Sequence, residues 1–432
     1  MSSQYIPEPE SAAKAPASIL SALNQINRRI LIGNAISSLG SGLTFSFLVI
    51  YLGQARGLGT TAAGLIVAYI AILGLLLTPA VGTLVDRLGP RPILMCGLVV
   101  ASLGSLLLVF VQGLPTAILA ATVLSAGQSL LWPPQAALLA RVTDPNRRQD
   151  LFGLQFLVLN LGLGLGGLIS ATIVDVAHPG SFTLLYALDA VAFLIYLVII
   201  LPMRGVGVGP VPAQEIKEGA AHSTAPRGYG RVLRDRAMVH LSIAAVVMLT
   251  CGYGALEVGL PTYLTLDGGL PAAMVAIAYA VNTAVIVVAQ IFVLRRIRGR
   301  SRSRLGAVVG LTWAASWLLI GISVAFPVWL CITLVCIGIA LFGLGETVWS
   351  PIGPAIVNEL ASEDLRGRYN AVSGWVWSVS GTVGPALAAV MLGAQLSVLW
   401  LGLVITGCLL AALLMARLHR RLTAQQDGAV AQ

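Results

Sequence analysis

Long apolar segments separated by short polar ones dominate the chain. A helix that spans a membrane needs roughly 20 predominantly apolar residues. Twelve segments meet this criterion, and glycine, proline and asparagine mark most of the breaks between them. The pattern predicts an all-α integral membrane protein with twelve transmembrane helices at residues 29–52, 61–84, 92–112, 115–140, 150–175, 181–201, 237–264, 271–294, 305–324, 328–358, 368–391 and 395–416.

The longest polar segment between spans, residues 203–236, divides them six and six. We interpret it as a linker between two helical bundles. Its last turn has the composition of a short amphipathic helix on the membrane surface, but we expect a flexible basic linker. The predicted organisation is a cytoplasmic tail, an N-terminal bundle, the linker, a C-terminal bundle and a second cytoplasmic tail, at residues 1–27, 28–202, 203–236, 237–417 and 418–432.

The two halves resemble each other in sequence. At a shift near 217 residues, Trp132-Pro133-Pro134 falls on Trp349-Ser350-Pro351, and one residue further on Gly166-Gly167 falls on Gly384-Pro385. The polar connection after the first landmark runs from acidic to basic residues in both halves. Six-helix halves in parallel repeat are typical of one class of secondary transporter, whose substrate site lies at mid-membrane between the halves.

Composition supports a membrane protein and explains the positive charge. Of 432 residues 57% are hydrophobic and only 10% charged, against about 25% charged in soluble proteins. Among the 26 basic residues, 25 lie in the two tails and the loops after spans 2, 4, 6, 8 and 10; Arg56 is the exception. The positive-inside rule places these segments and both termini in the cytoplasm, so the net charge of +9 does not indicate nucleic-acid binding.

The connection between spans 2 and 3 carries a recognisable motif. Its residues Gly82, Leu84, Asp86, Arg87, Gly89, Arg91 and Leu94 resemble the signature loop of the major facilitator superfamily, with Pro90 where a second basic residue is usual. The similarity to bacterial drug-efflux members of this superfamily covers residues 28–420. It implies the two-bundle fold, alternating access, a multi-pass location in a bacterial cytoplasmic membrane, and no enzymatic activity.

The resemblance also implies that this loop closes the cytoplasmic side, with Asp86 meeting the start of span 11. A carboxylate is favourable at a helix N-terminus, because free N–H groups and the helix dipole point at it. The alternative is a topology signal combined with a tight turn. We expect the corresponding loop of the second half, residues 294–304, to serve only as a basic anchor that attracts anionic lipid. The predicted gating residues are Gly82, Asp86, Arg87, Gly89, Arg91, Arg366 and Arg368.

Acidic residues at membrane depth are candidates for function, because an ionisable group there is costly unless it is used or paired. Glu346 lies near the middle of span 10, which lines the central cavity in this superfamily. We favour it as the proton or cationic-substrate site over a structural hydrogen-bonding role. The two readings are balanced for Glu257 in span 7, and a packing hydrogen bond is favoured for Asp189 in span 6.

Few other polar residues lie in the inner spans, which predicts a largely apolar cavity suited to amphipathic substrates. Glycine-rich spans 5 and 11 resemble the antiporter motif of the superfamily, although Gly384-Pro385 in span 11 has no Gly-Pro counterpart in span 5. The predicted cavity residues are Asn34, Ser38, Gln128, Asn160, Asn282, Trp349 and Trp375.

We therefore predict a secondary active transporter that exports a lipophilic or cationic small molecule in exchange for protons, as a monomer. The alternatives are a nutrient importer or facilitator on the same fold, and a non-transporting receptor. The four histidines and five cysteines lack metal-ligand spacing, and no Gly-x-x-x-x-Gly-Lys loop is present. No metal, cofactor or nucleic-acid partner is expected; the expected partners are substrate, protons and the lipid bilayer.

Overall fold

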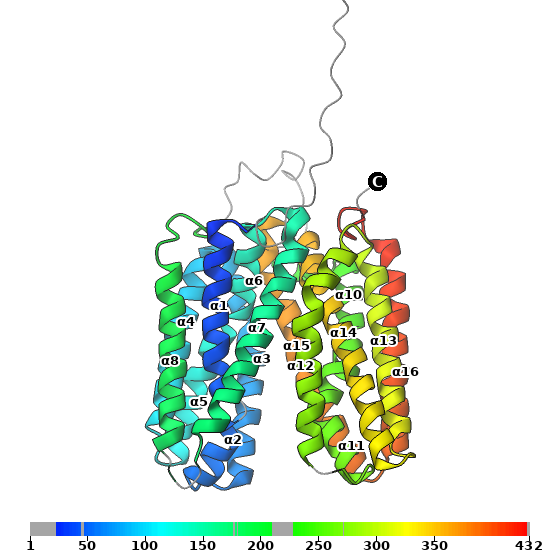
Figure 1. Ribbon diagram of the computed structural model, residues 1–432. Helices are drawn as coiled ribbons and strands as arrows, with labels where there is room; N and C mark the ends of the chain where they lie inside the picture. Colours follow the sequence, from blue (N-terminus) through cyan, green and yellow to red (C-terminus); the bar gives the residue numbers. More distant parts are fainter. Residues whose placement is uncertain are drawn as a thin grey trace, which may run out of the picture.

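The computed structural model describes residues 23–44, 47–175, 178, 180–209, 228–270 and 272–429, and these residues form helices and no strand (Figure 1). The first half contains α1 (Gln25–Thr44), α2 (Leu48–Ile50), the π-helix η2 (Tyr51–Ala55), α3 (Thr60–Leu88), α4 (Pro90–Val109), α5 (Leu114–Ser129), α6 (Trp132–Arg141), η3 (Pro145–Arg147), α7 (Arg148–Ile173) and α8 (Gly180–Ile200). The second half begins after the linker and contains α9 (Tyr229–Val232), α10 (Arg236–Leu249), the π-helix η5 (Thr250–Gly259), α11 (Leu260–Leu266), α12 (Ala272–Ile297), α13 (Arg302–Ser323), α14 (Val328–Leu360), η6 (Glu363–Leu365), α15 (Arg366–Gly393), α16 (Ser397–Leu418) and η7 (His419–Arg421).

The predicted spans are present in the described part of the chain. Eleven helical segments there are long and apolar enough to cross a membrane, counting α5 with α6 and α10 with η5 and α11 as one span each. Helix α1 and the segment Leu48–Ala55, which are bent by 41° relative to each other, supply a twelfth if they are taken together. The prediction of an all-α membrane fold is confirmed.

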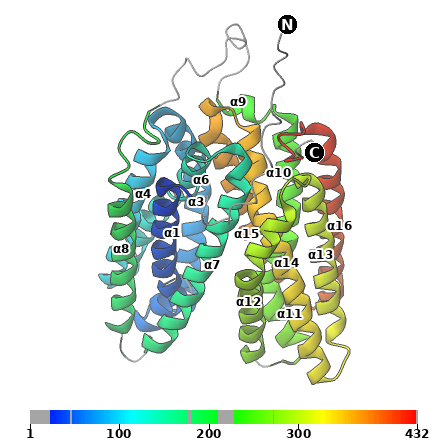
Figure 2. The same ribbon diagram turned by 45° about the horizontal axis from the view of Figure 1, so that its top comes forward.

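The two halves stand side by side, and the described chain begins and ends at the same end of the bundle (Figures 1 and 2). We call this the basic end, because the arginine-rich connections before α7, α13 and α15 lie there, and the other the opposite end. Helix α3 packs against α15, and α7 packs against α12 and α14, so these helices form the boundary between the halves. Helices α7 and α12 approach each other toward the basic end and diverge toward the opposite end (Figure 1).

Small residues permit the close approach of α3 and α15. A Cβ atom added to Gly82 would lie 2.5 Å from Cβ of Ala371 and 2.9 Å from the carbonyl oxygen of Gly367. A Cβ atom added to Gly367 would likewise lie 2.5 Å from the carbonyl oxygen of Gly82. The two backbones therefore touch at the basic end, as small residues allow between membrane helices.

The last part of the linker is ordered by contacts with the bundle. Residues 229–232 form α9, and the Tyr229 hydroxyl donates a hydrogen bond to the carbonyl oxygen of Pro79 in α3. Asp235 caps α10 by accepting from the backbone N–H of Ala237 at 2.9 Å, and its other oxygen accepts from the Tyr369 hydroxyl at 2.7 Å. The expectation of a flexible linker is therefore wrong for this turn; residues 210–227 lie outside the described residues.

Candidate functional site

A cavity lies between the two halves at the middle of the bundle. Its larger part, of about 440 Å³, is lined by α3, α5, α6 and α7 of the first half and α15 of the second. A smaller part of about 60 Å³ extends between α6, α7, α10, η5, α14 and α15, and both parts share Trp132, Phe156 and Trp377. We call the two parts together the central cavity. None of the lining residues is charged, and aromatic rings form much of the wall.

Glu346 is buried directly behind the wall of this cavity. Its side chain lies in α14, the whole residue is only 4% exposed, and its carboxyl accepts a hydrogen bond of 2.5 Å from the Asn282 amide in α12. The Tyr253 hydroxyl from η5 lies next to the same carboxyl, while the Tyr253 ring lines the cavity and contacts the Trp377 ring at 5.0 Å between centroids. Tyr253 therefore separates Glu346 from the cavity. A π-helical segment such as η5 is frequent at functional sites.

The other two candidate acids are placed differently. Asp189 is buried between α8, α4 and α1, where it accepts from the Ser105 hydroxyl at 2.6 Å and the Thr44 hydroxyl at 3.5 Å. These contacts are those of a packing hydrogen bond within the first half. Glu257 is exposed in η5 and lines neither part of the central cavity. The structure thus brings only Glu346 close to the cavity.

Asp86 holds the two halves together at the basic end. Its carboxylate accepts from the backbone N–H of Gly367 at 2.6 Å and of Arg368 at 3.3 Å, in the first turn of α15. The Arg368 guanidinium donates to the same carboxylate at 3.0 Å. This is the expected contact of an acid with a helix N-terminus and its dipole. We call it the first latch.

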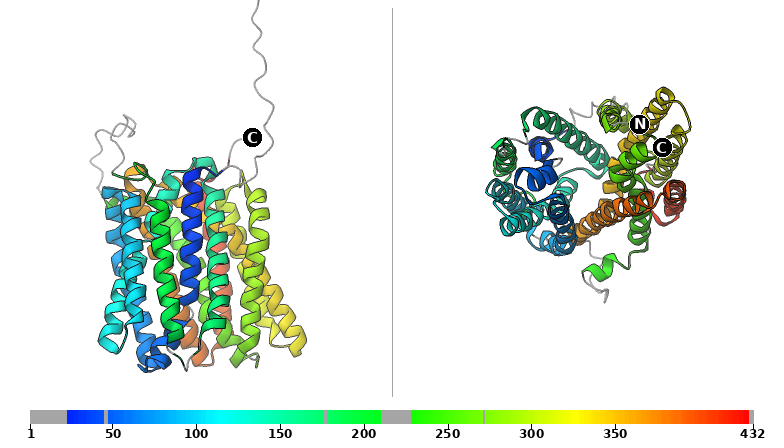
Figure 3. Two further views of the ribbon diagram at one scale, coloured as in Figure 1. Left: turned by 60° about the vertical axis from the view of Figure 1, so that its left-hand side comes forward. Right: turned by 90° about the horizontal axis from the view of Figure 1, so that it is seen from below.

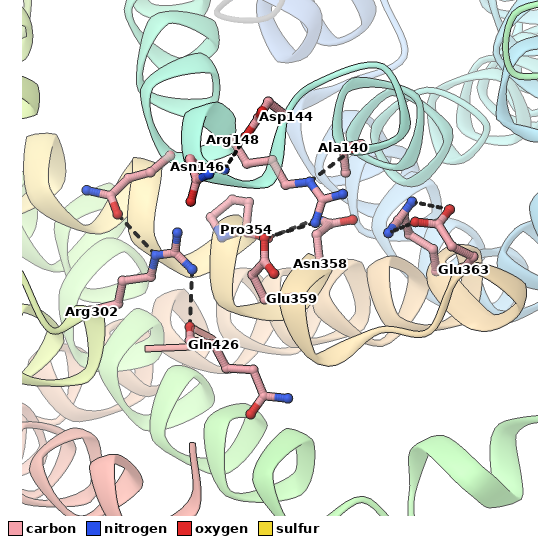
Figure 4. A network of polar contacts seen from close by, with 12 residues as sticks. Ala140, Asp144, Asn146, Arg148, Arg302, Pro354, Asn358, Glu359, Glu363 and Gln426 are labelled. Carbon is pink, nitrogen blue, oxygen red and sulfur yellow. Dashed lines mark hydrogen bonds and ion pairs between the residues drawn. The ribbon is translucent and has the colours of Figure 1, made fainter. Parts of the chain in front are cut away.

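A buried ion pair crosses the same boundary (Figure 4). The Arg148 guanidinium at the start of α7 donates to Glu359 near the end of α14 at 2.9 Å, and both side chains are at most 8% exposed. The guanidinium also donates to the carbonyl oxygen of Ala140 at 3.0 Å. Neither residue was among the sequence candidates. Removal of one partner from a buried pair typically costs about 3–5 kcal/mol, because the other charge is left buried and unpaired, so each residue depends on the other while the basic end is closed.

The arginine-rich loop of the second half also binds the first half. Arg298 makes two hydrogen bonds with the Asp150 carboxylate, of 3.0 and 2.6 Å, and Arg302 donates to the Gln149 side chain at 3.1 Å. We call these contacts, which join residues 298 and 302 to the first turn of α7, the second latch. The expectation that residues 294–304 serve only as a basic anchor is therefore wrong. The acid that completes the contact lies on α7 and not in the loop.

The remaining predicted gating residues occupy supporting places. Gly89 ends α3 with a φ of +89°, where a side chain would be strained. Arg91 donates to the carbonyl oxygens of Ile200 and Leu201 at the end of α8, at 3.3 and 2.7 Å, and so anchors two helices of the first half. Arg366 pairs with Glu363 and not with Asp86. Arg87 is exposed.

Of the predicted cavity residues, Gln128 and Trp349 line the central cavity. Asn34 and Ser38 are buried in α1, Asn160 donates within α7 to the carbonyl oxygen of Phe156, and Asn282 binds Glu346. Trp375 donates to the carbonyl oxygen of Leu75 at 2.7 Å and lies outside the cavity. Sequence reasoning missed Trp132, Phe156 and Tyr253; Trp132 could have been found as the repeat counterpart of Trp349, whereas the other two are marked only by an aromatic ring in an inner span.

Comparison with known proteins assigns the family. The family model described as Major Facilitator Superfamily matches residues 30–344, well over half of the chain. The chain belongs to the major facilitator superfamily. The family and the fold make it a multi-pass membrane transporter. The prediction from the loop around Asp86 is confirmed at this level.

Individual relatives are distant. The quinolone resistance protein NorA of Staphylococcus aureus is 28% identical over 164 residues, which are 38% of this chain and 42% of NorA, so the match spans less than half of that protein. The uncharacterized MFS-type transporter YhjO of Bacillus subtilis (strain 168) is 23% identical over 361 residues, 83% of this chain and 84% of YhjO.

Among solved structures, a bacterial homologue of the iron transporter ferroportin in its outward-facing state has a TM-score of 0.74 at 14% identity, covering 92% of this chain and 100% of that one. The human organic anion transporter MFSD10 has a TM-score of 0.68 at 17% identity, covering 90% and 98%. At these identities the likeness supports the superfamily fold alone.

Proposed function

We propose that this superfamily member exports lipophilic or cationic small molecules in exchange for protons, and that Glu346 carries the proton. The observation that supports this most directly is the position of Glu346, a buried carboxyl separated from an uncharged aromatic cavity by one ring, that of Tyr253. Among the described residues no cation contacts this carboxyl; its hydrogen-bond donor is the Asn282 amide, and the Tyr253 phenol lies beside it. Protonation or the arrival of a cationic substrate would each neutralise it, so the two would compete.

The proposal includes an orientation. With the basic end in the cytoplasm, as the positive-inside rule requires, the two latches and the Arg148–Glu359 pair close the cytoplasmic side. Among the described residues, the hydrogen bonds and ion pairs found between the halves lie at the basic end or at mid-depth, where Trp375 binds Leu75. We therefore propose that the structure represents an outward-facing state. The partial similarity to NorA, whose name refers to drug resistance, is consistent with export.

The test is proton movement driven by substrate in reconstituted vesicles. Wild-type protein in proteoliposomes that contain a pH-sensitive dye should release protons when tetraphenylphosphonium, ethidium or a quinolone is added. Glu346→Gln should reduce this flux at least tenfold, because glutamine cannot exchange a proton, while the purified variant stays folded. Asp189→Asn is the matched control, since Asp189 is equally buried but remote from the cavity, and its flux should remain.

Two results would contradict the proposal. Unchanged proton flux in Glu346→Gln would remove that residue from coupling. Accumulation of the compounds inside cells on expression of the protein, in place of reduced accumulation, would instead favour an importer on the same fold.

A further inference from the structure

A second, smaller hollow lies on the outer side of the second half. It has a volume of about 210 Å³ and is a groove between α10 and α15 that α9 closes at the basic end. The lining consists of apolar side chains and one hydroxyl, from Val232, Leu233, Met238, Val239, Ser242, Ile243, Val246, Val372, Trp375, Val376 and Val379. Trp375 is fixed there by its hydrogen bond to α3. This outer groove is a different place from the central cavity, although Met238, Ser242 and Val376 border both.

The groove is accessible from the surrounding membrane. Leu233, Ile243 and Trp375 are 61%, 53% and 45% exposed, which is large for apolar side chains that converge on one hollow. On α10 the lining positions 239, 242, 243 and 246, and on α15 the positions 372, 375, 376 and 379, each follow the helical repeat along one face. The groove therefore runs along the two helices, in the direction that a lipid acyl chain takes in a bilayer.

Positive charge lies at the closed end of the groove. Arg231 and Arg234 flank the lining residue Leu233, and both are exposed. The nearby acid Asp235 is already engaged, because its two oxygens accept from the α10 N-terminus and from Tyr369. Within the described part of the chain, the side chains of Arg231 and Arg234 make no hydrogen bond or ion pair. Arg231 belongs to α9, and Figure 3 (right) shows α9 as a short green helix at the rim of the ring of spanning helices.

We propose that this groove binds one acyl chain of an anionic phospholipid, whose phosphate is held by Arg231 and Arg234. An apolar channel parallel to the bilayer normal, with unpaired guanidinium groups where it meets the membrane surface, complements a phospholipid at both ends. Basic residues close to the membrane surface favour anionic over zwitterionic headgroups. Arginine also suits a phosphate, because its planar fork can donate two hydrogen bonds to it. Lipid binding at this site would make the position of α9, and with it the end of the linker, depend on the lipid composition of the membrane.

The test is lipid retention by the delipidated full-length protein in detergent. Native mass spectrometry should show retention of dioleoyl phosphatidylglycerol in preference to dioleoyl phosphatidylcholine. Arg231→Gln with Arg234→Gln should weaken retention roughly 30-fold, and Ile243→Trp, which fills the groove without changing charge, should weaken it comparably. The matched control is Arg295→Gln with Arg296→Gln, an exposed basic pair at the end of α12, which should retain the lipid as the wild type does.

A second readout locates the lipid in the wild-type protein. Phosphatidylglycerol with a photoreactive group in one acyl chain should cross-link to peptides of α10 and α15. Equal loss of retention in both arginine pairs, unchanged retention in Ile243→Trp, or cross-links on other helices would each overturn the proposal. Equal retention of phosphatidylcholine would overturn the assignment of the phosphate to the two arginines.

Discussion

At the scale of single residues, Asp86 makes the most specific prediction. Its side chain is 4% exposed and accepts three hydrogen bonds from the first turn of α15, one of them from a guanidinium. Hydrogen bonds to a charged group are worth about 1.5–3 kcal/mol each when one partner is removed. Asp86→Asn keeps the shape but removes the charge, so we expect the closed population at the basic end to fall by roughly tenfold.

Accessibility of a single cysteine measures this change. In protein whose five native cysteines are replaced by alanine, a cysteine introduced at Thr78, which lines the central cavity, should react faster with a reagent added from the basic end when Asp86→Asn is present than when it is absent. Transport should slow, while substrate binding to the cavity remains. Arg87→Gln is the control, because Arg87 is exposed and adjacent. If substrate binding is lost together with turnover, the loop is a structural element and not a gate.

How much of the site could be predicted from the sequence depends on how local the information is. The carboxylate of Asp86 and the N-terminus of α15 were predictable, because a motif fixes one and a hydrophobic pattern begins at the other. The pair Arg148–Glu359 was not, since 211 positions separate its members and many arginines precede helices at this end. Asn282, predicted to face the cavity, binds Glu346 because α12 and α14 are close where Gly343 lacks a side chain.

At the scale of elements, the last described segment of the chain supports the second latch. Asp427 is buried and accepts from the Ser301 hydroxyl at 2.5 Å, the Ser303 backbone N–H at 2.8 Å and His419 at 3.0 Å. The carbonyl oxygen of Gln426 accepts from Arg302 at 3.1 Å, and the same guanidinium reaches Gln149 across the boundary. The segment after α16 thus holds Arg302 in the orientation that the second latch needs.

This arrangement predicts a pH dependence. Burial alone would raise the pKa of Asp427, but the hydrogen bonds from Ser301, Ser303 and His419 outweigh it and hold that pKa below its usual value. Asp427 therefore contributes stability above its ordinary pKa of about 3.9, and this contribution is lost as the pH falls through the lowered value. We expect the amide hydrogens of residues 423–429 to remain protected from exchange at pH 5–7.

Hydrogen exchange followed by mass spectrometry checks the segment directly. Asp427→Ala should speed exchange in residues 423–429 by tenfold or more at neutral pH, because buried donors lose their acceptor. Gln425→Ala changes an exposed side chain of the same segment and should leave exchange unchanged. Equal protection in Asp427→Ala and the wild type would show that the segment is held by other contacts.

At the scale of the whole molecule, the two latches are related by the sequence repeat, with their charges exchanged. Helices α7 and α15 begin at Arg148 and Arg366, which lie 218 residues apart, and the same shift places Asp150 on Arg368. In the first latch, the acid Asp86 at the end of α3 binds Arg368 of α15. In the second latch, Arg298 after α12 binds the acid Asp150 of α7. The loop of residues 294–304 contains no acid, and the acid of the second latch is Asp150 on its partner helix.

Exchange of the charges in the second latch tests this relation. Asp150→Arg places two arginines together, and Arg298→Asp places two aspartates together. Each single variant should therefore reduce the closed population at the basic end about fivefold. The double variant restores an ion pair in reverse and should return it to within about twofold of wild type. Spin labels on the two halves at the basic end measure the closed population as a distance distribution. The control is Arg300→Asp, a charge reversal in the same loop, which should leave the closed population unchanged. Failure of the double variant to recover would mean that Asp150 and Arg298 act separately, each through other neighbours, and not as a latch between the halves.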